Sequence, residues 1–169
     1  IVLALSALAF GAIADNFFTP FNLTLVIQQV TIIGILGIAQ TLIILTAGID
    51  LSIAAIMVLA TVVMGGLGVN LGIPSIIAVP IGLVCGILCG AINGGLVTVF
   101  RLPPFIVTLG TWQIFFAIVL WLSAGQSIRS QDIDAAAPLL KVFGGTFSLF
   151  GAQFTTGSVM MLLLFIIFW

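Results

Sequence analysis

The chain has 169 residues, of which 63% are hydrophobic and only 4% are charged, with a mean hydropathy of +1.51 and a formal net charge of -1. A water-soluble domain carries roughly 25% charged residues, so the composition excludes a soluble globular protein. Three basic side chains also give no field able to neutralise a run of phosphates, which excludes nucleic acid as a partner.

Catalytic and metal sites are poorly supported by the residue types present. The sequence contains no His, Tyr or Glu, so the common general acids and bases and the imidazole metal ligands are missing. Cys85 and Cys89 lie one helical turn apart in an apolar run, without the second pair that a metal site requires. We expect them to act as small packing residues, and we expect no catalytic residue, metal or cofactor in this chain.

Apolar runs separated by turn-forming residues predict an all-α fold, a polytopic transmembrane helical bundle. The first run, Ile1–Ile13, is too short to cross about 30 Å of hydrocarbon. It is either a signal peptide or the end of a first spanning helix, and we prefer the helix because no cleavage site leads into a soluble domain. About four complete spans are expected after it. They are Leu23–Thr46, Leu51–Val69, Ser75–Phe100 and Phe105–Ser123.

Both ends of the sequence fall within or close to apolar runs. The chain begins at Ile1 without Met and ends at Trp169, inside a run that starts near Val159. We therefore expect residues 1–169 to form a single transmembrane domain, as a fragment of a longer chain with truncated first and last helices.

Glycine, proline and aspartate mark the breaks between the expected spans. Gly48 is placed to end one helix and Asp50 to cap the next. Pro103 and Pro104 end a later helix firmly, because neither has a backbone N–H group to donate. The breaks are expected at Asp15–Asn22, Ala47–Ser52, Asn70–Pro74 and Arg101–Pro104.

The segment Ala124–Gly157 is the only substantial aqueous piece that the sequence predicts, and it holds four of the charged residues. Within it, Asp132–Phe143 is expected to form a short surface helix, because an aspartate lies at its start and Lys141 near its end. Gly144 and Gly145 are expected to stop this helix.

Small residues recur at every fourth position of the fourth expected span. Each step of four residues advances by about 40°, so these positions form one inclined ridge along the helix. In lipid, close approach of two helices at such a ridge is a main source of association, and we expect a buried, central helix. A direct role in lining a pathway is the alternative. The ridge consists of Ala78, Gly82, Gly86, Gly90 and Gly94.

Asp50 is the sole ionisable residue between Asp15 and Arg101, and its depth decides its meaning. At the bilayer centre it would be a functional candidate by default. At an interface it would cap the third helix by accepting amide hydrogens of the first turn. The lengths of the flanking spans favour the interface.

Amide side chains within the spans are the other candidates. Gln29 and Gln40 project from nearly the same face of the second helix, a face that lipid would not tolerate. Asn93 and Gln113 raise the same question in the next helices. Such side chains either form interhelical hydrogen bonds or point at a water-filled path.

Specific strings resemble the membrane permeases of bacterial ABC importers for ribose, xylose and related monosaccharides. The order and spacing of the strings match those permeases over nearly the whole chain, and Gly-Ile-Asp-Leu-Ser and Pro-Pro-Phe-Ile-Val-Thr-Leu-Gly-Thr are the most specific of them. They lie in Asn16–Thr19, Gln40–Ile53, Arg101–Thr111 and Gly125–Ile128. The pair Ala54-Ala55 replaces a glycine-containing motif common in that family.

The resemblance implies a non-catalytic permease in the bacterial inner membrane that forms the path for a sugar or similar solute. Its implied partners are ABC ATPase subunits, a periplasmic solute-binding protein, a second permease copy and membrane lipid. The implied topology puts Ala124–Gly157 outside as an extracytoplasmic loop and Asp50 and Arg101 near the cytoplasm. A literal count of basic residues places that loop inside, but three cations are too few for the rule to decide.

Candidate residues follow from polarity and position within this topology. Gln29, Gln40, Asn93 and Gln113 are the candidates for the translocation path. The candidates for docking the binding protein are Arg129, Asp132 and Asp134, whose charges suit a wet interface. A fragment of a secondary, ion-coupled carrier and a non-transporting membrane scaffold are the alternative functions.

Overall fold

The computed structural model describes residues 1–149 and 152–168. The chain divides into two compact units, Ile1–Ile38 with Phe143–Trp169 and Ala39–Val142, each described here by itself. Among the described residues, four helical segments are long and apolar enough to cross a membrane, which confirms the prediction of an all-α membrane bundle. They are α2 (Pro20–Leu45), α3 (Ile53–Gly65) with its continuation η1 (Gly66–Asn70), α4 (Ser75–Thr98) and α5 (Pro104–Ser123).

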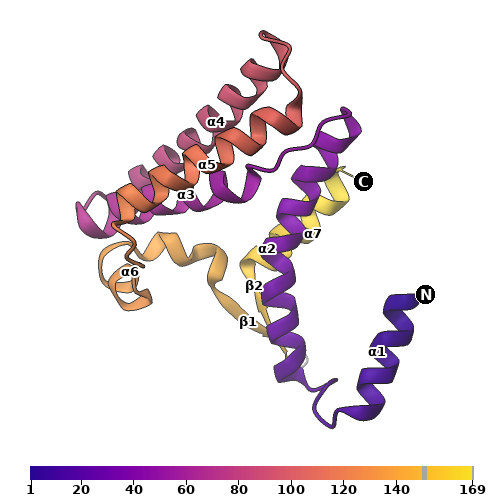
Figure 1. Cartoon of the computed structure of the whole chain (residues 1–169). Coiled ribbons are helices and arrows are strands. Elements are labelled where there is room, and N and C mark those ends of the chain that lie inside the picture. The colour runs from indigo at the N-terminus through magenta and orange to yellow at the C-terminus, as the bar shows by residue number, and fades with distance from the viewer. Residues whose placement is uncertain (150–151, 169) are drawn as a thin grey trace. The chain divides into compact units, whose positions relative to one another are not determined.

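The unit Ala39–Val142 is built around α3, which packs against both α4 and α5 (Figure 1). Its core is made of small and aliphatic side chains and one aromatic ring, and Cys85 packs against it as expected. The helix α4 runs antiparallel to both α3 and α5. The start of α3 therefore lies at one end of the unit, and η1 lies at the other end. The buried core residues are Ala55, Leu59, Cys89, Phe115 and Val119.

The break before α5 follows from its prolines. Pro103 is the N-cap residue and Pro104 occupies the first turn, where a missing N–H group costs nothing and the fixed φ suits a helix. The chain reverses just before this point through Arg101, which adopts a left-handed φ of 54°. The prolines therefore act at the start of α5 as well as after α4.

Among the described residues, only the first part of the small-residue ridge in α4 meets another helix. A Cβ at Gly82 would meet the Met64 side chain and lie 2.9 Å from the Ala60 carbonyl oxygen, whereas Gly90 and Gly94 face open space. The physical reason is the drift of about 40° per step, which carries the later glycines around the helix axis. The face that stays buried follows a different spacing, through Ser75, Ala78, Gly82, Cys89 and Asn93.

The third span is not α-helical throughout. It changes from α3 into the π-helical turn η1, where the Leu71 amide donates to the Gly66 carbonyl 3.1 Å away. A π-helical turn is rare and is frequently found at functional sites. The predicted break after Asn70 is present, and its chain reversal includes Gly72 at φ 65°.

The unit formed by the two ends of the chain contains α1 (Val2–Ile13), most of α2, a β-hairpin and α7 (Thr156–Phe168). In the turn after α1, the ring of Phe17 stacks on Phe10 and meets Phe18 edge-on. The hairpin is joined to α2 by a hydrogen bond, which the backbone amide of Gln153 donates to Thr24 Oγ1 at 2.8 Å.

The segment expected to be aqueous differs from its sequence prediction in two ways. The single helix predicted over Asp132–Phe143 is replaced by α6 (Ser130–Ala136) and the 3₁₀ segment η2 (Pro138–Gly144). Pro138 explains the division, because it has no N–H group and disfavours helical geometry in the residue before it.

The second difference is the antiparallel hairpin of β1 (Thr146–Leu149) and β2 (Ala152–Thr155), which the sequence analysis did not predict. The pairs Thr146–Thr155 and Phe147–Phe154 lie opposite each other, and the two Phe rings stack 5.9 Å apart. Apolar and polar residues alternate in β1, which is the period of a strand with two different faces.

We expect Gly82→Ala to destabilise the contact between α3 and α4. The added methyl group must displace Met64 or the Ala60 backbone, and overpacking of this kind costs about 1 to 3 kcal/mol. Gly90→Ala is the matched control, because it gains the same helix propensity in open space. Thermal unfolding in detergent measures both variants. Equal midpoints for the two variants would contradict the assigned contact.

Candidate functional site

A buried polar cluster lies where the chain passes from α2 into α3. Asp50 Oδ1 accepts two hydrogen bonds from Ser52, one from its backbone amide and one from its hydroxyl group, each 2.7 Å long. Ser52 is fully buried, with 0% of its surface exposed. The carboxylate therefore fixes the backbone just before the first turn of α3.

This geometry changes the predicted role of Asp50. The N-cap residue of α3 is Ser52, and its side chain makes no capping hydrogen bond to the helix. Asp50 thus does not accept hydrogen bonds from the first-turn amides, as a cap would. It lies two residues before the N-cap residue Ser52 and accepts hydrogen bonds from that residue instead. Gly48 lies in the same break, where its amide donates to the Ile43 carbonyl at 3.1 Å.

Side chains from α4 and α5 complete the cluster. Asn93 Nδ2 of α4 donates to Ser52 Oγ at 2.7 Å. Thr108 Oγ1 of α5 lies 2.9 Å from the Pro104 carbonyl oxygen of its own helix, which is its shorter hydrogen bond, and 3.2 Å from the Ile49 carbonyl oxygen. Both side chains are buried, with 5% and 3% of their surfaces exposed. Asn93 Oδ1 has no hydrogen-bond partner among the described residues. One end of the helix unit is therefore joined by a chain of polar contacts.

The other path candidates occupy different surroundings. Gln40 is half-buried, and its Oε1 is also without a partner in the described part of the chain. Gln113 is exposed on α5. Gln29 is exposed on the part of α2 that belongs to the other unit. Of the four, the structure brings only Asn93 into the buried cluster, and the shared path remains a prediction.

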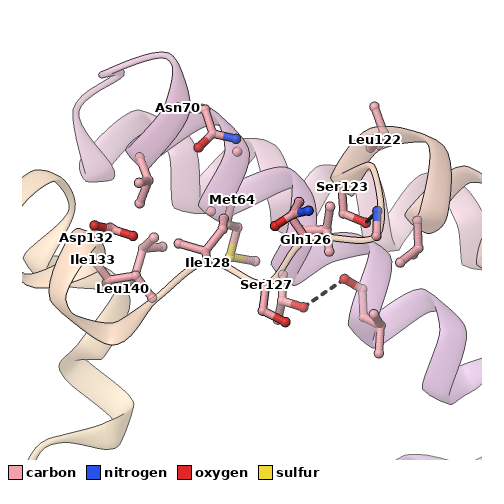
Figure 2. Close-up of a pocket in the computed structure, with 18 of the residues that line it drawn as sticks. Met64, Asn70, Leu122, Ser123, Gln126, Ser127, Ile128, Asp132, Ile133 and Leu140 are labelled. Carbon is pink, nitrogen blue, oxygen red and sulfur yellow. Dashed lines mark hydrogen bonds between the residues drawn. The ribbon is translucent and has the colours of Figure 1, made fainter.

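The opposite end of the same unit contains a cavity of about 640 Å³ (Figure 2). Its walls come from α3 with η1, from the end of α5 and from the segment that follows α5. Most of the lining is aliphatic, but several polar groups are placed around it. These are Thr61, Asn70, Ser123, Gln126, Ser127 and Asp132.

Two glycines seat the segment after α5 against α3 and η1. A Cβ at Gly65 would collide with the Ile128 side chain, and one at Gly68 would lie 2.9 Å from the Ala137 Cβ. Ala137 is fully buried at this contact. The segment is therefore packed on the helix end at two points, and this packing defines one wall of the cavity.

The charged residues proposed for docking fall in three different settings. Asp134 forms an ion pair with Lys141, with 2.6 Å between Oδ1 and Nζ, while 61% of the Asp134 side chain stays exposed. Arg129 is exposed at the N-cap of α6, and Asp132 lines the cavity. Docking by these three residues remains a prediction.

Sequence reasoning missed Ser52 and Thr108. Serine and threonine in membrane helices commonly bond to their own helix, so neither residue type signals a tertiary contact. The Asp-Leu-Ser spacing was a usable signal for Ser52, because an aspartate often accepts from the amide two residues on. Within the described ranges, no three His, Cys, Asp or Glu side chains gather to hold a metal.

Most of the sequence matches one known protein family. Residues 22–169 match the family described as the branched-chain amino acid transport system / permease component. The chain belongs to this permease family. It is a multi-pass membrane protein with four candidate spans among its described residues. No solved structure matches the permease chain significantly.

Individual relatives are permeases named for sugar import. The chain is 54% identical to the fructose import permease protein FrcC of Rhizobium meliloti over 170 residues, which cover 100% of this chain and 47% of that protein. It is 32% identical to the ribose import permease protein RbsC of Bacillus subtilis, over 91% of this chain and 46% of the relative. The D-allose transport system permease protein AlsC of Escherichia coli is 37% identical, over 79% and 41%. The chain thus spans about half the length of these relatives.

We expect Ser52→Ala to destabilise the permease by about 1 to 3 kcal/mol, because it leaves the buried Asn93 amide without its acceptor. Adding Asn93→Leu to that variant removes the stranded amide and should restore part of the loss. Chemical unfolding of the two single variants and the double variant completes the cycle. Strictly additive effects would mean that the two side chains do not interact.

We expect Gly68→Ala to loosen the segment after α5, because the new methyl group competes with Ala137 for the same space. Trypsin reports this directly, since Arg129 and Lys141 lie in that segment. Cleavage there should become faster than in the wild type. Gly66→Ala is the control in the same π-helical turn, where a methyl group meets nothing within 4 Å. A cleavage rate unchanged in Gly68→Ala would show that the contact does not hold the segment.

Proposed function

We propose that this chain is the N-terminal part of the permease subunit of an ATP-driven importer for a sugar or similar small polar solute. The observation that carries the proposal is the 54% identity to a fructose import permease over the whole chain. The permease itself is not catalytic; ATP hydrolysis belongs to separate ABC ATPase subunits, and a periplasmic binding protein delivers the solute.

The residues in the spans support transport of an uncharged solute. The polar groups at depth are amides and hydroxyl groups. The carboxylate of Asp50 lies at one end of the helix unit and already accepts two hydrogen bonds from Ser52. Such groups replace part of a solute's hydration without a deep well that would slow its release. Gln29, Gln40, Asn93 and Gln113 line the path in this proposal.

The proposed location is the bacterial inner membrane, with the segment Ala124–Gly157 on the outer side. This places the cavity beside η1 at the outer surface and the cluster around Asp50 near the cytoplasm. Arg129 and Asp134 are then external charges available to the binding protein. Exposed amides such as Gln29 and Gln113 favour further helices around this chain, from the remainder of the permease and from a second copy.

Reconstitution of the full-length permease with its ATPase and binding protein tests the function. We expect ATP-dependent uptake of D-fructose into proteoliposomes, and no uptake without the ATPase or the binding protein. The double variant Gln29→Leu/Gln40→Leu should lower the uptake rate about thirtyfold, since each change removes about 1 kcal/mol of hydrogen bonding to the solute or its water, which is about fivefold per change.

Gln28→Leu is the matched control, because it removes an adjacent amide that points about 100° away around the same helix. If the paired variant transports as well as the control, the amides of α2 do not line the path. If the wild-type assembly accumulates solute without ATP, the permease is a secondary carrier and the proposed importer is excluded.

A further inference from the structure

The cavity beside η1 has the size of a small-molecule site. Its volume of about 640 Å³ falls within the range of roughly 300 to 1,000 Å³ that is usual for ligand pockets. It is formed by two stretches that are distant in the sequence, residues 58–70 and 119–140, as Figure 2 shows for Met64 and Asn70 of the first and for Ser123, Asp132 and Leu140 of the second. It is therefore a tertiary feature and not a groove along one helix.

The polar lining suits a ligand with many hydroxyl groups. Asn70 and Gln126 each offer an amide that both donates and accepts, and they come from η1 and from the segment after α5. Ser127 adds a hydroxyl group, and Asp132 adds a carboxylate that accepts from donors. A sugar presents hydroxyl groups in several directions. These side chains, which come from η1 and from the segment after α5, offer hydrogen-bond donors and acceptors to such groups.

The charge of the lining selects against anions. Asp132 is the one ionised side chain among the described residues that line the cavity; Arg129 and Lys141 do not line it. A phosphorylated or carboxylate-bearing solute would meet a like charge with no cation among the lining residues to offset it. The cavity therefore fits a neutral solute.

The lining also indicates weak, transient binding. It contains no aromatic ring among the described residues, so a sugar finds aliphatic surface but no stacking platform. The wall itself is fixed, because Ile128 fits at Gly65, Ala137 fits at Gly68, and the chain leaves α5 through a left-handed turn at Ala124 and Gly125. A preformed site with few strong contacts binds and releases quickly.

We propose that this cavity is a transit site for a neutral, monosaccharide-sized polyol, which it holds through Asn70, Gln126 and Asp132 between the binding protein and the membrane path. This inference rests on the proposed import function and adds to it a site, a ligand class and a discrimination against anionic solutes.

Uptake by the full-length assembly in proteoliposomes gives the first test. Asn70→Leu and Gln126→Leu each remove an amide at similar volume, and each should lower D-fructose uptake about tenfold, the effect of losing one or two hydrogen bonds to the solute. Gln131→Leu is the control, because it removes an exposed amide from α6 outside the cavity. ATPase stimulation by the empty binding protein should be the same in all variants, which separates solute contact from docking.

Direct binding gives the second test. Saturation-transfer NMR of the permease–ATPase complex in nanodiscs, without the binding protein, should detect contact with D-fructose and none with fructose 6-phosphate. Asn70→Leu should remove the D-fructose signal, and Asp132→Asn should admit the phosphate.

The outcomes separate the site from the function. Absence of ATP-dependent uptake by the wild-type assembly would overturn the import function itself. Normal wild-type uptake together with full activity of Asn70→Leu and Gln126→Leu would leave the function intact and overturn the transit site. Equal NMR signals from fructose and its phosphate in the wild-type complex would also overturn it.

Discussion

The helix unit depends on how closely α3 approaches α4. Lipid tails are as apolar as leucine, so burial of hydrocarbon alone does not draw two helices together in a bilayer. Gly82 removes the side chain that would separate the helices, and Met64 and the Ala60 backbone fill the space. With α3 held in this way, its other side is positioned to pack against α5, and Phe115 and Val119 join Leu59 in one core. The polar cluster and the cavity are attached to the two ends of this same helix.

Polar contacts fix the position of α3 along α4. A bundle held by apolar contact tolerates sliding, whereas the chain from Asp50 through Ser52 to Asn93 fixes where α3 begins relative to α4. Such hydrogen bonds contribute modestly to stability, but a buried donor or acceptor left without a partner is costly. The helices therefore prefer the one arrangement in which these groups are paired. Asn93 Oδ1, which has no hydrogen-bond partner among the described residues, is the exception within this cluster.

Sequence patterns predicted the spans well because lipid imposes them: a helix that crosses hydrocarbon must be long and apolar whatever its neighbours are. The breaks at Gly48 and Pro103 were equally local. The packing role of the second half of the α4 ridge stays a prediction, because a four-residue repeat follows the helix surface and only the position of a partner helix shows what each residue meets. The helix over Asp132–Phe143 failed at Pro138, a local signal that was overlooked. The cavity was beyond sequence reasoning, since the two stretches that line it, residues 58–70 and 119–140, meet only in the folded chain.

The continuity of α3 into η1 has a mechanical consequence. The combined segment Ile53–Asn70 is a rod about 27 Å long at 1.5 Å per residue, anchored to Asn93 through Ser52 at one tip and fitted against Ile128 and Ala137 near the other. A stiff rod transmits displacement along its axis. An axial displacement of the first turn of α3 therefore also moves η1 and the residues packed against it, unless the π-helical turn itself changes shape.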